Sequence, residues 1–271
     1  ACTQYLAELP ERAKREAEWL HQQEIAAALC DMPLWSISAC EQAGVPLLYV
    51  GNFTWTELYR EFLPEQIWEA YAAEYRKIQH GMLYALHNPE MLEFLHRAEL
   101  SETSLVARPF HPDEIQAIRA RHTCPIVFVA LGMSAQFTQP VSVEGVEAHF
   151  YVTEGVPLTG SNVTVIPYST LHTQDYVAVA DYVITKAGWG TVAECLLAQK
   201  PMALFARDSV LEDRTTIRKL EQKKLAIKVT YEQLTEMSEL LKQMKQITYP
   251  AVPEYHNAAA EIVSKLLTLT E

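Results

Sequence analysis

Basic residues are scarce in this sequence. Its 22 lysines and arginines stand against 34 aspartates and glutamates, so the formal net charge over 271 residues is −12. A protein of that sign repels a phosphate backbone, which argues against DNA and RNA as partners. A small anionic ligand is still allowed, because a local site can be positive on an acidic protein.

Long apolar runs and patterned cysteines are also missing. No run is long enough to cross a bilayer, and no signal peptide is present. The five cysteines include no C-x-x-C pair, and their odd number argues against a disulfide framework. These features predict free thiols in a reducing, cytoplasmic setting. The chain begins at Ala1 rather than at Met, so we expect that a segment upstream is absent from it.

Several common catalytic motifs are absent as well. The nine histidines show no H-E-x-x-H spacing, so no metal site is predicted. There is no G-x-x-x-x-G-K-[ST] loop for P-loop chemistry and no G-x-S-x-G elbow for a hydrolase. We expect no bound cofactor.

The second half of the chain alternates strands with helices. Apolar residues make up 49% of the sequence, enough for one large domain or two smaller ones. Six predicted strands begin near residues 125, 147, 162, 181, 201 and 225, with helices at 174–180, 190–199, 213–223, 231–246 and 255–268. Such alternation is typical of a parallel sheet covered on both faces.

The first half is less regular. A helix is predicted at 3–24, strands at 25–31 and 45–52, a helix at 36–42, and aromatic-rich helices over 54–86. Only two strands are predicted there, too few for a complete Rossmann-like sheet. The proline-containing segment 104–113 is the predicted linker, which divides the chain into domains 1–110 and 111–271.

The stretch TKAGWGTVAE contains a glycine turn between a strand and a helix. Gly188, Gly190 and Ala193 form G-x-G-x-x-A, and Asp208 follows at the spacing of a dinucleotide-binding domain. In that fold, however, the glycine turn follows the first strand. Here three predicted strands precede it and only two follow, so we reject a dinucleotide fold.

The turn can still bind a phosphorylated ligand. Gly188 and Gly190 let the backbone approach closely, and the following helix presents free N–H groups and the positive end of its dipole. Thr191 adds a hydroxyl and Lys186 a charge. Glu194, expected at an exposed helix start, suits ribose hydroxyls better than phosphate. A nucleoside diphosphate fits this set; the alternative is a tight turn and a capped helix without a ligand.

The segment DYVITKAGWGTVAECLLAQKP resembles the donor-nucleotide segment of GT-B glycosyltransferases related to the peptidoglycan N-acetylglucosaminyltransferase. It is more similar still to the glycosyltransferase-like N-terminal part of plant L-arabinokinase and its stand-alone bacterial relatives. The resemblance extends to CDMPLWSISACEQAGVPLLYVGNFTW and to LVARPF. It implies an α/β fold of the GT-B type, with two Rossmann-like domains facing a cleft, the N-terminal one incomplete. It also implies that the last helix packs back toward the first domain.

The resemblance assigns roles to individual residues. Glu194 matches the acid that binds the ribose, and Gly190 and Thr191 match the diphosphate-binding turn. The other implied donor-site residues are Gly132, Met133 and Ser134 near the phosphates, Ile166 and Tyr168 near the base, usually uracil, and Arg207, Asp208 and Arg214 near the sugar.

The chain departs from the family at two places. The better-known branch often has a glutamine pair where this chain has Arg214, Thr215 and Thr216. The resemblance therefore does not determine which sugar the donor carries. No strand and glycine-rich loop precede Ile25, so either a segment is missing or the first domain is degenerate.

Three residues of the first half are candidates for the acceptor side. Asp31 ends a predicted strand and is either the base that takes the acceptor proton or a cap of the next helix. Asn52 and Trp55 either line the acceptor site or serve as a helix cap and core.

Three functions remain in order of preference. The first is a metal-independent hexosyltransferase that uses a nucleotide sugar, with UDP as the expected nucleotide, and an unknown acceptor. The second is a catalytically idle nucleotide-binding or regulatory module, and the third is a sugar-nucleotide epimerase. A homodimer is compatible with each.

Overall fold

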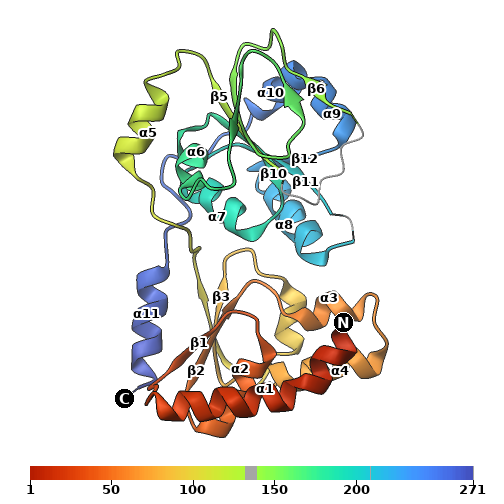
Figure 1. Ribbon diagram of the computed structural model, residues 1–271, viewed down its shortest axis with the longest axis vertical. Helices are drawn as coiled ribbons and strands as arrows, with labels where there is room; N and C mark the ends of the chain where they lie inside the picture. The colour runs from red at the N-terminus through yellow and green to blue at the C-terminus, as the bar shows by residue number, and fades with distance from the viewer. Residues whose placement is uncertain (132–138, 208, 271) are drawn as a thin grey trace. The chain divides into compact units, whose positions relative to one another are not determined.

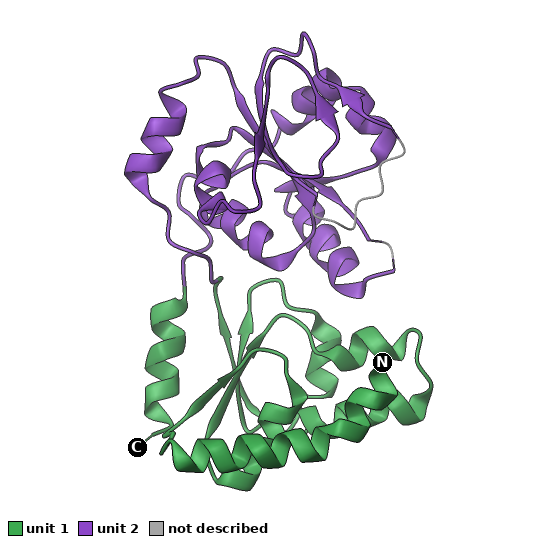
Figure 2. Ribbon diagram, in the orientation of Figure 1, with its two compact units in different colours: residues 1–105, 258–271 green, residues 106–257 purple. Residues whose placement is uncertain are grey.

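The chain forms two compact units. The computed structural model describes residues 1–131, 139–207 and 209–270. Unit 1 contains residues 1–105 and 258–271, and unit 2 contains residues 106–257 (Figure 2). The predicted division at 110/111 places the last helix with the second domain, whereas its contacts place it in unit 1, as the family resemblance implies. Within the described ranges, no helix is long and apolar enough to cross a membrane.

Unit 1 is built on a four-stranded parallel sheet in the order β1-β2-β3-β4 (Figure 1). The strands are β1 (Ala28–Cys30), β2 (Leu47–Gly51), β3 (His80–Tyr84) and β4 (Glu99–Thr103). The helices are α1 (Cys2–Gln22), α2 (Leu34–Ala43), α3 (Trp55–Arg60), α4 (Glu65–Tyr75), the 3-10 helix η1 (Pro89–Glu93) and α11 (Ala259–Thr268). On α1, four buried apolar residues recur every three or four positions, which is the spacing of one helical face: Leu9, Ala13, Ala17 and Leu20.

The prediction of only two strands in the first half is wrong, because β3 and β4 complete a four-stranded sheet. β3 lies inside the range predicted as helical, and its Gly81 makes it hard to recognise as a strand from the sequence. A Cβ at Gly81 would lie 2.8 Å from Cδ2 of Leu100 on β4, so glycine permits the two strands to pair closely. β4 has the sequence ELSET and is largely exposed, so it has no apolar pattern. α11 accompanies it through hydrogen bonds from Thr103 to Glu261 and from Lys265 to Glu99.

Unit 2 contains a six-stranded sheet, all parallel, in the order β12-β11-β10-β5-β7-β9. The six predicted strands are confirmed as β5 (Ile126–Ala130), β7 (His149–Thr153), β9 (Val163–Ile166), β10 (Tyr182–Lys186), β11 (Met202–Phe205) and β12 (Ala226–Val229). The helices are α5 (Pro112–Arg119), α6 (Thr173–Val179), α7 (Trp189–Leu197), α8 (Leu211–Gln222), α9 (Tyr231–Thr235) and α10 (Met237–Met244). The helix predicted over 231–246 is thus divided at Glu236. A small pair, β6 (Val141–Ser142) and β8 (Leu158–Thr159), completes the unit.

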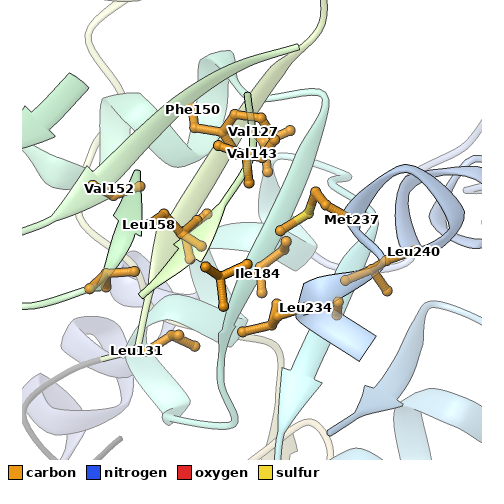
Figure 3. Packing of buried hydrophobic residues seen from close by; sticks show 14 of the residues in the cluster. Val127, Leu131, Val143, Phe150, Val152, Leu158, Ile184, Leu234, Met237 and Leu240 are labelled. Atoms are coloured by element: carbon orange, nitrogen blue, oxygen red, sulfur yellow. The ribbon is translucent and has the colours of Figure 1, made fainter. Parts of the chain in front are cut away.

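Both faces of the unit 2 sheet are buried. Alternate residues Val127, Phe150 and Ile184 face a core that includes Leu234 and Met237 from α9 and α10 (Figure 3). Their neighbours along the strands, such as Phe128 and Val183, are equally buried on the other face. Because both faces are buried, these strands are continuous apolar runs in the sequence. Their positions could therefore be predicted from the sequence.

Two histidines pack against each other at the amino edge of this sheet. The rings of His122 and His149 stack with centroids 4.0 Å apart; His122 Nε2 lies 2.7 Å from Tyr151 Oη, and His149 Nε2 lies 3.0 Å from Thr164 Oγ1. Desolvation lowers the pKa of His122, and Arg119 and Arg121 lower it further. Desolvation and the neighbouring His122 lower the pKa of His149.

We expect this pair to make unit 2 less stable in mild acid. Both histidines bind protons more weakly in the folded than in the unfolded chain, so stability falls as the pH drops below the ordinary value of 6.5. Urea denaturation at pH 7.5, 6.5 and 5.5 should show the free energy of unfolding decreasing. The decrease should be smaller in His149→Gln, whose amide keeps a polar partner for Thr164. An equal decrease in parent and variant would contradict this assignment.

Candidate functional site

The glycine turn lies at the point where the unit 2 sheet reverses direction. β5, β7 and β9 follow one another outward, and the chain then returns to place β10 on the other side of β5. Open α/β sheets bind ligands outside the carboxyl ends of the strands at such a reversal. Three strands of the same sheet, β5, β7 and β9, precede β10 along the chain, as the sequence predicted, so the turn does not follow the first strand of its sheet. Gly132, Met133 and Ser134, predicted after β5, lie outside the described residues.

The first turn of α7 is open to a ligand. Gly188 is the N-cap residue of the helix and has no side chain with which to cap its first turn. A Cβ added at Gly190 would meet nothing within 4 Å, whereas one at Gly188 would lie 3.3 Å from Cε of Lys186. Neither glycine has a positive φ, so both leave space rather than permit an unusual conformation. The amide groups and dipole of α7, with Lys186 over the turn, favour an anion there.

Thr191 and Glu194 lie deeper in the helix than the sequence predicted. The helix starts at Trp189, so Thr191 is its third residue and Glu194 its sixth. Glu194 was expected at an exposed helix start, and this expectation is wrong: the residue is only 5% exposed. Its neighbours Ala193 and Cys195 are also buried, because this side of the helix packs on the sheet. A carboxylate at such a place needs a partner.

Arg108 is that partner, and sequence reasoning missed its role. Its Nη2 and Nε lie 2.9 Å and 3.0 Å from Glu194 Oε1. The guanidinium also donates to Leu171 O (3.1 Å) and to Thr173 Oγ1 (3.0 Å) at the start of α6. Burial raises the pKa of Glu194, Arg108 lowers it, and Asp175 nearby raises it. The signal available in the sequence was the LVARPF segment, which includes this arginine.

A second buried carboxylate holds the same segment. Asp175, 1% exposed, accepts hydrogen bonds from the backbone N–H of His111 (2.9 Å) and from its Nδ1 (2.8 Å). Gln174 donates to Pro109 O (3.1 Å). Residues 108–111 are therefore fastened by side chains to the start of α6 and to the middle of α7. Because Arg108 belongs to this segment, Asp175 and Gln174 fix the position of the cation beside Glu194.

The residues predicted near the base differ in exposure. Ile166 ends β9 and is buried, whereas Tyr168 is 62% exposed. The N–H of Tyr168 donates to Glu154 Oε2 (3.2 Å), which holds the backbone while the ring stays accessible. Of the two, Tyr168 can present a flat surface to a ligand.

The residues predicted near the sugar are only partly available. Arg207 donates from its backbone N–H, its Nε and its Nη2 to Asp213, which is fully buried at the start of α8 (3.1, 2.9 and 2.7 Å). Arg207 therefore shapes the loop through Asp213. Asp208 lies outside the described residues. Arg214 is on α8, in the turn that follows this loop.

In unit 1, Asp31 follows β1 directly at the carboxyl edge of its sheet and is exposed. It does not cap α2, whose N-cap is Pro33. No described residue forms a hydrogen bond with the Asp31 carboxylate, and desolvation raises its pKa. Met32, between Asp31 and Pro33, has a φ of 89°. An unengaged carboxylate of raised pKa has the properties of a proton acceptor.

Asn52 and Trp55 also lie at this edge. Asn52 is buried, and its carbonyl accepts from the N–H of Asn88 (2.6 Å). Trp55 is the first residue of α3 and stacks on Tyr59 with centroids 5.4 Å apart. Trp55 lines a cavity, whereas Asn52 is buried at this edge of the sheet and does not line that cavity. In the described part of the chain, no three His, Cys, Asp or Glu residues are grouped to hold a metal ion.

Comparison with known proteins identifies a family. Residues 127–269 match the glycosyltransferase family 28 C-terminal domain. No curated protein matches the sequence.

Solved structures of similar fold cover nearly the whole chain. Phytolacca americana UGT2, complexed with UDP-2fluoro-glucose and pterostilbene, has 11% identity and a TM-score of 0.65, over 99% of this chain and 81% of that one. The spinosyn forosaminyltransferase SpnP has 13% identity and a TM-score of 0.63, over 94% and 78%. Arabidopsis thaliana UGT89C1 complexed with UDP has 11% identity and a TM-score of 0.62, over 98% and 79%. At these identities the likeness shows the fold, which is the predicted GT-B fold with parallel sheets.

Proposed function

The chain belongs to the glycosyltransferase family 28 C-terminal domain family, and on this premise we propose that it transfers a sugar from a UDP-sugar to an acceptor hydroxyl. The observation that carries the proposal is the start of α7 at the sheet reversal, where the N-cap is a glycine, with open space over Gly190 and a carboxylate one turn further on. These features match the parts of a nucleoside diphosphate. Structures of similar fold contain UDP, UDP-2fluoro-glucose and UDP-L-rhamnose, which supports the uridine nucleotide.

The diphosphate is assigned to the α7 turn. Amide groups near Gly190, the hydroxyl of Thr191 and the ammonium of Lys186 face its negative charge. When the bond between the sugar and the diphosphate breaks, the leaving UDP gains charge, and these fixed donors stabilise it without reorganising. Gly132, Met133 and Ser134 are further candidates for phosphate contacts.

The nucleoside is assigned to Glu194 on α7 and to the end of β9. Arg108 holds Glu194 through Oε1, which leaves Oε2 to accept from the ribose hydroxyls. Tyr168 offers a flat ring to uracil beside Ile166. Arg207, Asp208 and Arg214 are assigned to the sugar, with Arg207 acting through its bond to Asp213.

The acceptor is assigned to unit 1. Asp31 is the proposed base that takes the proton of the attacking hydroxyl, because its carboxylate is exposed and its pKa is raised. Asn52 and Trp55 are assigned to the acceptor side. Trp55 is proposed to contact the acceptor, and the buried Asn52 to support this edge of the sheet.

Finer assignments rest on sequence resemblance. We propose kinship with the peptidoglycan N-acetylglucosaminyltransferase branch, and within it with the glycosyltransferase-like region of L-arabinokinase, from the segments 30–55, 105–110 and 181–201. We further propose a cytoplasmic hexosyltransferase that requires neither metal nor cofactor and that is able to form a homodimer.

The test uses a glycine that tolerates a methyl group. Gly190→Ala meets no atom in the unliganded protein and should stabilise it by about 0.5 kcal/mol, since alanine is the better helix former. If the diphosphate lies over this residue, the same methyl group should weaken UDP binding about 10-fold or more. Thr191→Val removes one hydroxyl and should weaken binding by about 1 kcal/mol. Calorimetric titration with UDP, ADP and NADH measures each effect.

The outcomes separate the candidate functions. UDP binding to the parent with unchanged affinity in Gly190→Ala would refute the assigned site, and preference for NADH would refute the ligand class. UDP binding without turnover of any UDP-sugar, across a panel of acceptors, would indicate the idle module. Altered sugar stereochemistry without an acceptor would indicate an epimerase. Loss of turnover on adding a chelator would contradict metal independence.

A further inference from the structure

The segment that enters unit 2, residues 106–111, lies outside the matched family domain but contacts the proposed donor site. The family match begins at residue 127, whereas Arg108 reaches Glu194 on α7. Nε and Nη2 of Arg108 lie 3.0 Å and 2.9 Å from the same carboxylate oxygen, Oε1. A residue from outside the family domain thus fixes one oxygen of the carboxylate that is assigned to the ribose.

The guanidinium of Arg108 is itself held in one orientation. Its Nη1 donates to Leu171 O at 3.1 Å, and its Nη2 donates to Thr173 Oγ1 at 3.0 Å, where α6 begins. All three nitrogen atoms of the group are therefore engaged. Because the guanidinium is planar and rigid, these contacts also set the direction from which it meets Glu194.

Fastening the segment to unit 2 does not by itself explain this ion pair. Asp175 already accepts two hydrogen bonds from His111, and Gln174 donates to Pro109 O. Burying a carboxylate carries a desolvation cost, and a well-packed apolar side chain in its place often gives equal or greater stability. Glu194 is nevertheless only 5% exposed. A charge kept at such a place beside the α7 turn indicates a role in binding.

Among the described residues, two charged groups act on the Glu194 carboxylate. Burial raises the pKa of Glu194, Arg108 lowers it through its hydrogen bond and its charge, and Asp175 on α6 raises it. Asp175 is itself paired with His111. On α7, the neighbouring Cys195 thiol is neutral, because burial raises its pKa well above the ordinary value. Without Arg108, the remaining influences favour the protonated carboxyl, which accepts hydrogen bonds less strongly.

We propose that Arg108 is a positioning residue for the nucleoside, which holds the Glu194 carboxylate charged and oriented toward the ribose. The donor site is then completed by a segment that the family domain does not include. The inference rests on the proposed function, which assigns Glu194 to the ribose. It adds the residue that makes this carboxylate able to bind, and it makes nucleotide affinity depend on how residues 108–111 are held.

The test compares the pH dependence of UDP binding in the parent protein and in Arg108→Gln by titration calorimetry. Without the guanidinium, Glu194 should take up a proton at higher pH, so UDP binding should be lost mainly at pH 6.0. The ratio of UDP affinity at pH 8.5 to that at pH 6.0 should be about 3-fold or more larger in the variant than in the parent. UDP and His111 titrate in both proteins, so their effects cancel in this comparison. Equal ratios would overturn the proposal, whatever the absolute loss of affinity.

Matched variants separate this role from a structural one. Arg108→Lys keeps a positive charge beside Glu194 and should retain the parent's ratio, with lower affinity because an ammonium cannot replace the planar group. Arg119→Gln breaks another ion pair of unit 2, with Asp181, and should leave UDP binding unchanged. Urea denaturation checks that each variant is folded. A change in ratio in Arg119→Gln equal to that in Arg108→Gln would overturn the proposal.

Inorganic pyrophosphate, which lacks the ribose, separates the nucleoside from the diphosphate. Its affinity ratio between the two pH values should be the same in Arg108→Gln and in the parent. If pyrophosphate shows the change expected for UDP, Arg108 acts on the phosphates directly and the proposal is overturned.

Failure of this inference is distinguishable from failure of the proposed function. A parent protein that binds UDP, together with an Arg108→Gln variant of unchanged ratio, removes only the role of Arg108. A folded parent protein that binds neither UDP nor ADP removes the proposed function and this inference together.

Discussion

Glu194→Gln should weaken UDP binding by about 10- to 100-fold. The side chain keeps its shape but loses its charge, and charge-assisted hydrogen bonds to ribose hydroxyls contribute about 1.5–3 kcal/mol each. The variant should also be less stable, by about 1–2 kcal/mol, because Arg108 then faces a neutral amide. The loss of stability is limited, since the Arg108 side chain is 49% exposed and can regain water.

Calorimetry and urea denaturation of the same preparation separate the two effects. Glu239→Gln, an exposed change on α10, is the matched control and should alter neither. A folded Glu194→Gln protein with the UDP affinity of the parent would place the ribose elsewhere. Because Glu194 is buried, truncation to alanine would mix the loss of a ligand contact with the loss of packing.

The second large effect is a pH-dependent change in stability from Glu57 in unit 1. Glu57 is fully buried in the first turn of α3, where it accepts from the backbone N–H of Thr54 (2.6 Å) and from its hydroxyl. Burial raises the pKa of Glu57 from 4.5 to about 7, and the bonds from Thr54 oppose this rise only in part. The folded state therefore holds the proton more tightly than the unfolded state.

The sign of the effect follows from this difference. The contribution of Glu57 to stability is fully present below pH 4.5 and is lost as the pH rises through about 7. An elevation from 4.5 to about 7 corresponds to about 3 kcal/mol. Glu57→Gln cannot ionise, and its amide can accept from the Thr54 N–H and donate to the Thr54 hydroxyl. Its free energy of unfolding should therefore exceed that of the parent by up to about 3 kcal/mol at pH 8.5.

Denaturation curves of parent and variant at pH 5 and pH 8.5 measure the difference directly. The exposed Glu65→Gln on α4 serves as the control and should follow the parent at both values. A Glu57→Gln variant that is less stable than the parent at pH 8.5 would show that the carboxylate itself stabilises the helix start.

Local patterns predicted the parts of the fold whose strands are buried on both faces. β5, β7, β10 and β11 are short apolar runs between turns, and each was found within two residues of its true start. β3 and β4 were missed, because the first contains a glycine that its neighbour requires and the second is a polar edge strand. Such strands are defined by their partners rather than by their own sequence.

In the candidate site, too, the features that are local in sequence could be predicted, and those that depend on distant residues could not. The glycine turn and its helix are contiguous in sequence, so their position could be predicted. The burial of Glu194 could not, since its partner Arg108 is 86 residues away, and His111 and Asp175 are 64 residues apart. No local pattern reports a contact of that separation.

The division of unit 1 into residues 1–105 and 258–271 has a consequence for its synthesis on the ribosome. The N–H of Ala258 donates to Leu105 O (2.8 Å), so the chain leaves unit 1 and re-enters it at one point, and the whole of unit 2 is an insertion. At about 5–20 residues per second, translation of residues 106–257 takes roughly 8–30 s. During that interval β4 lacks the helix that supplies Glu261 and Lys265. Unit 2 can complete its hydrophobic core during this interval, whereas unit 1 cannot. Unit 1, whose synthesis begins first, is therefore the unit that completes its fold last.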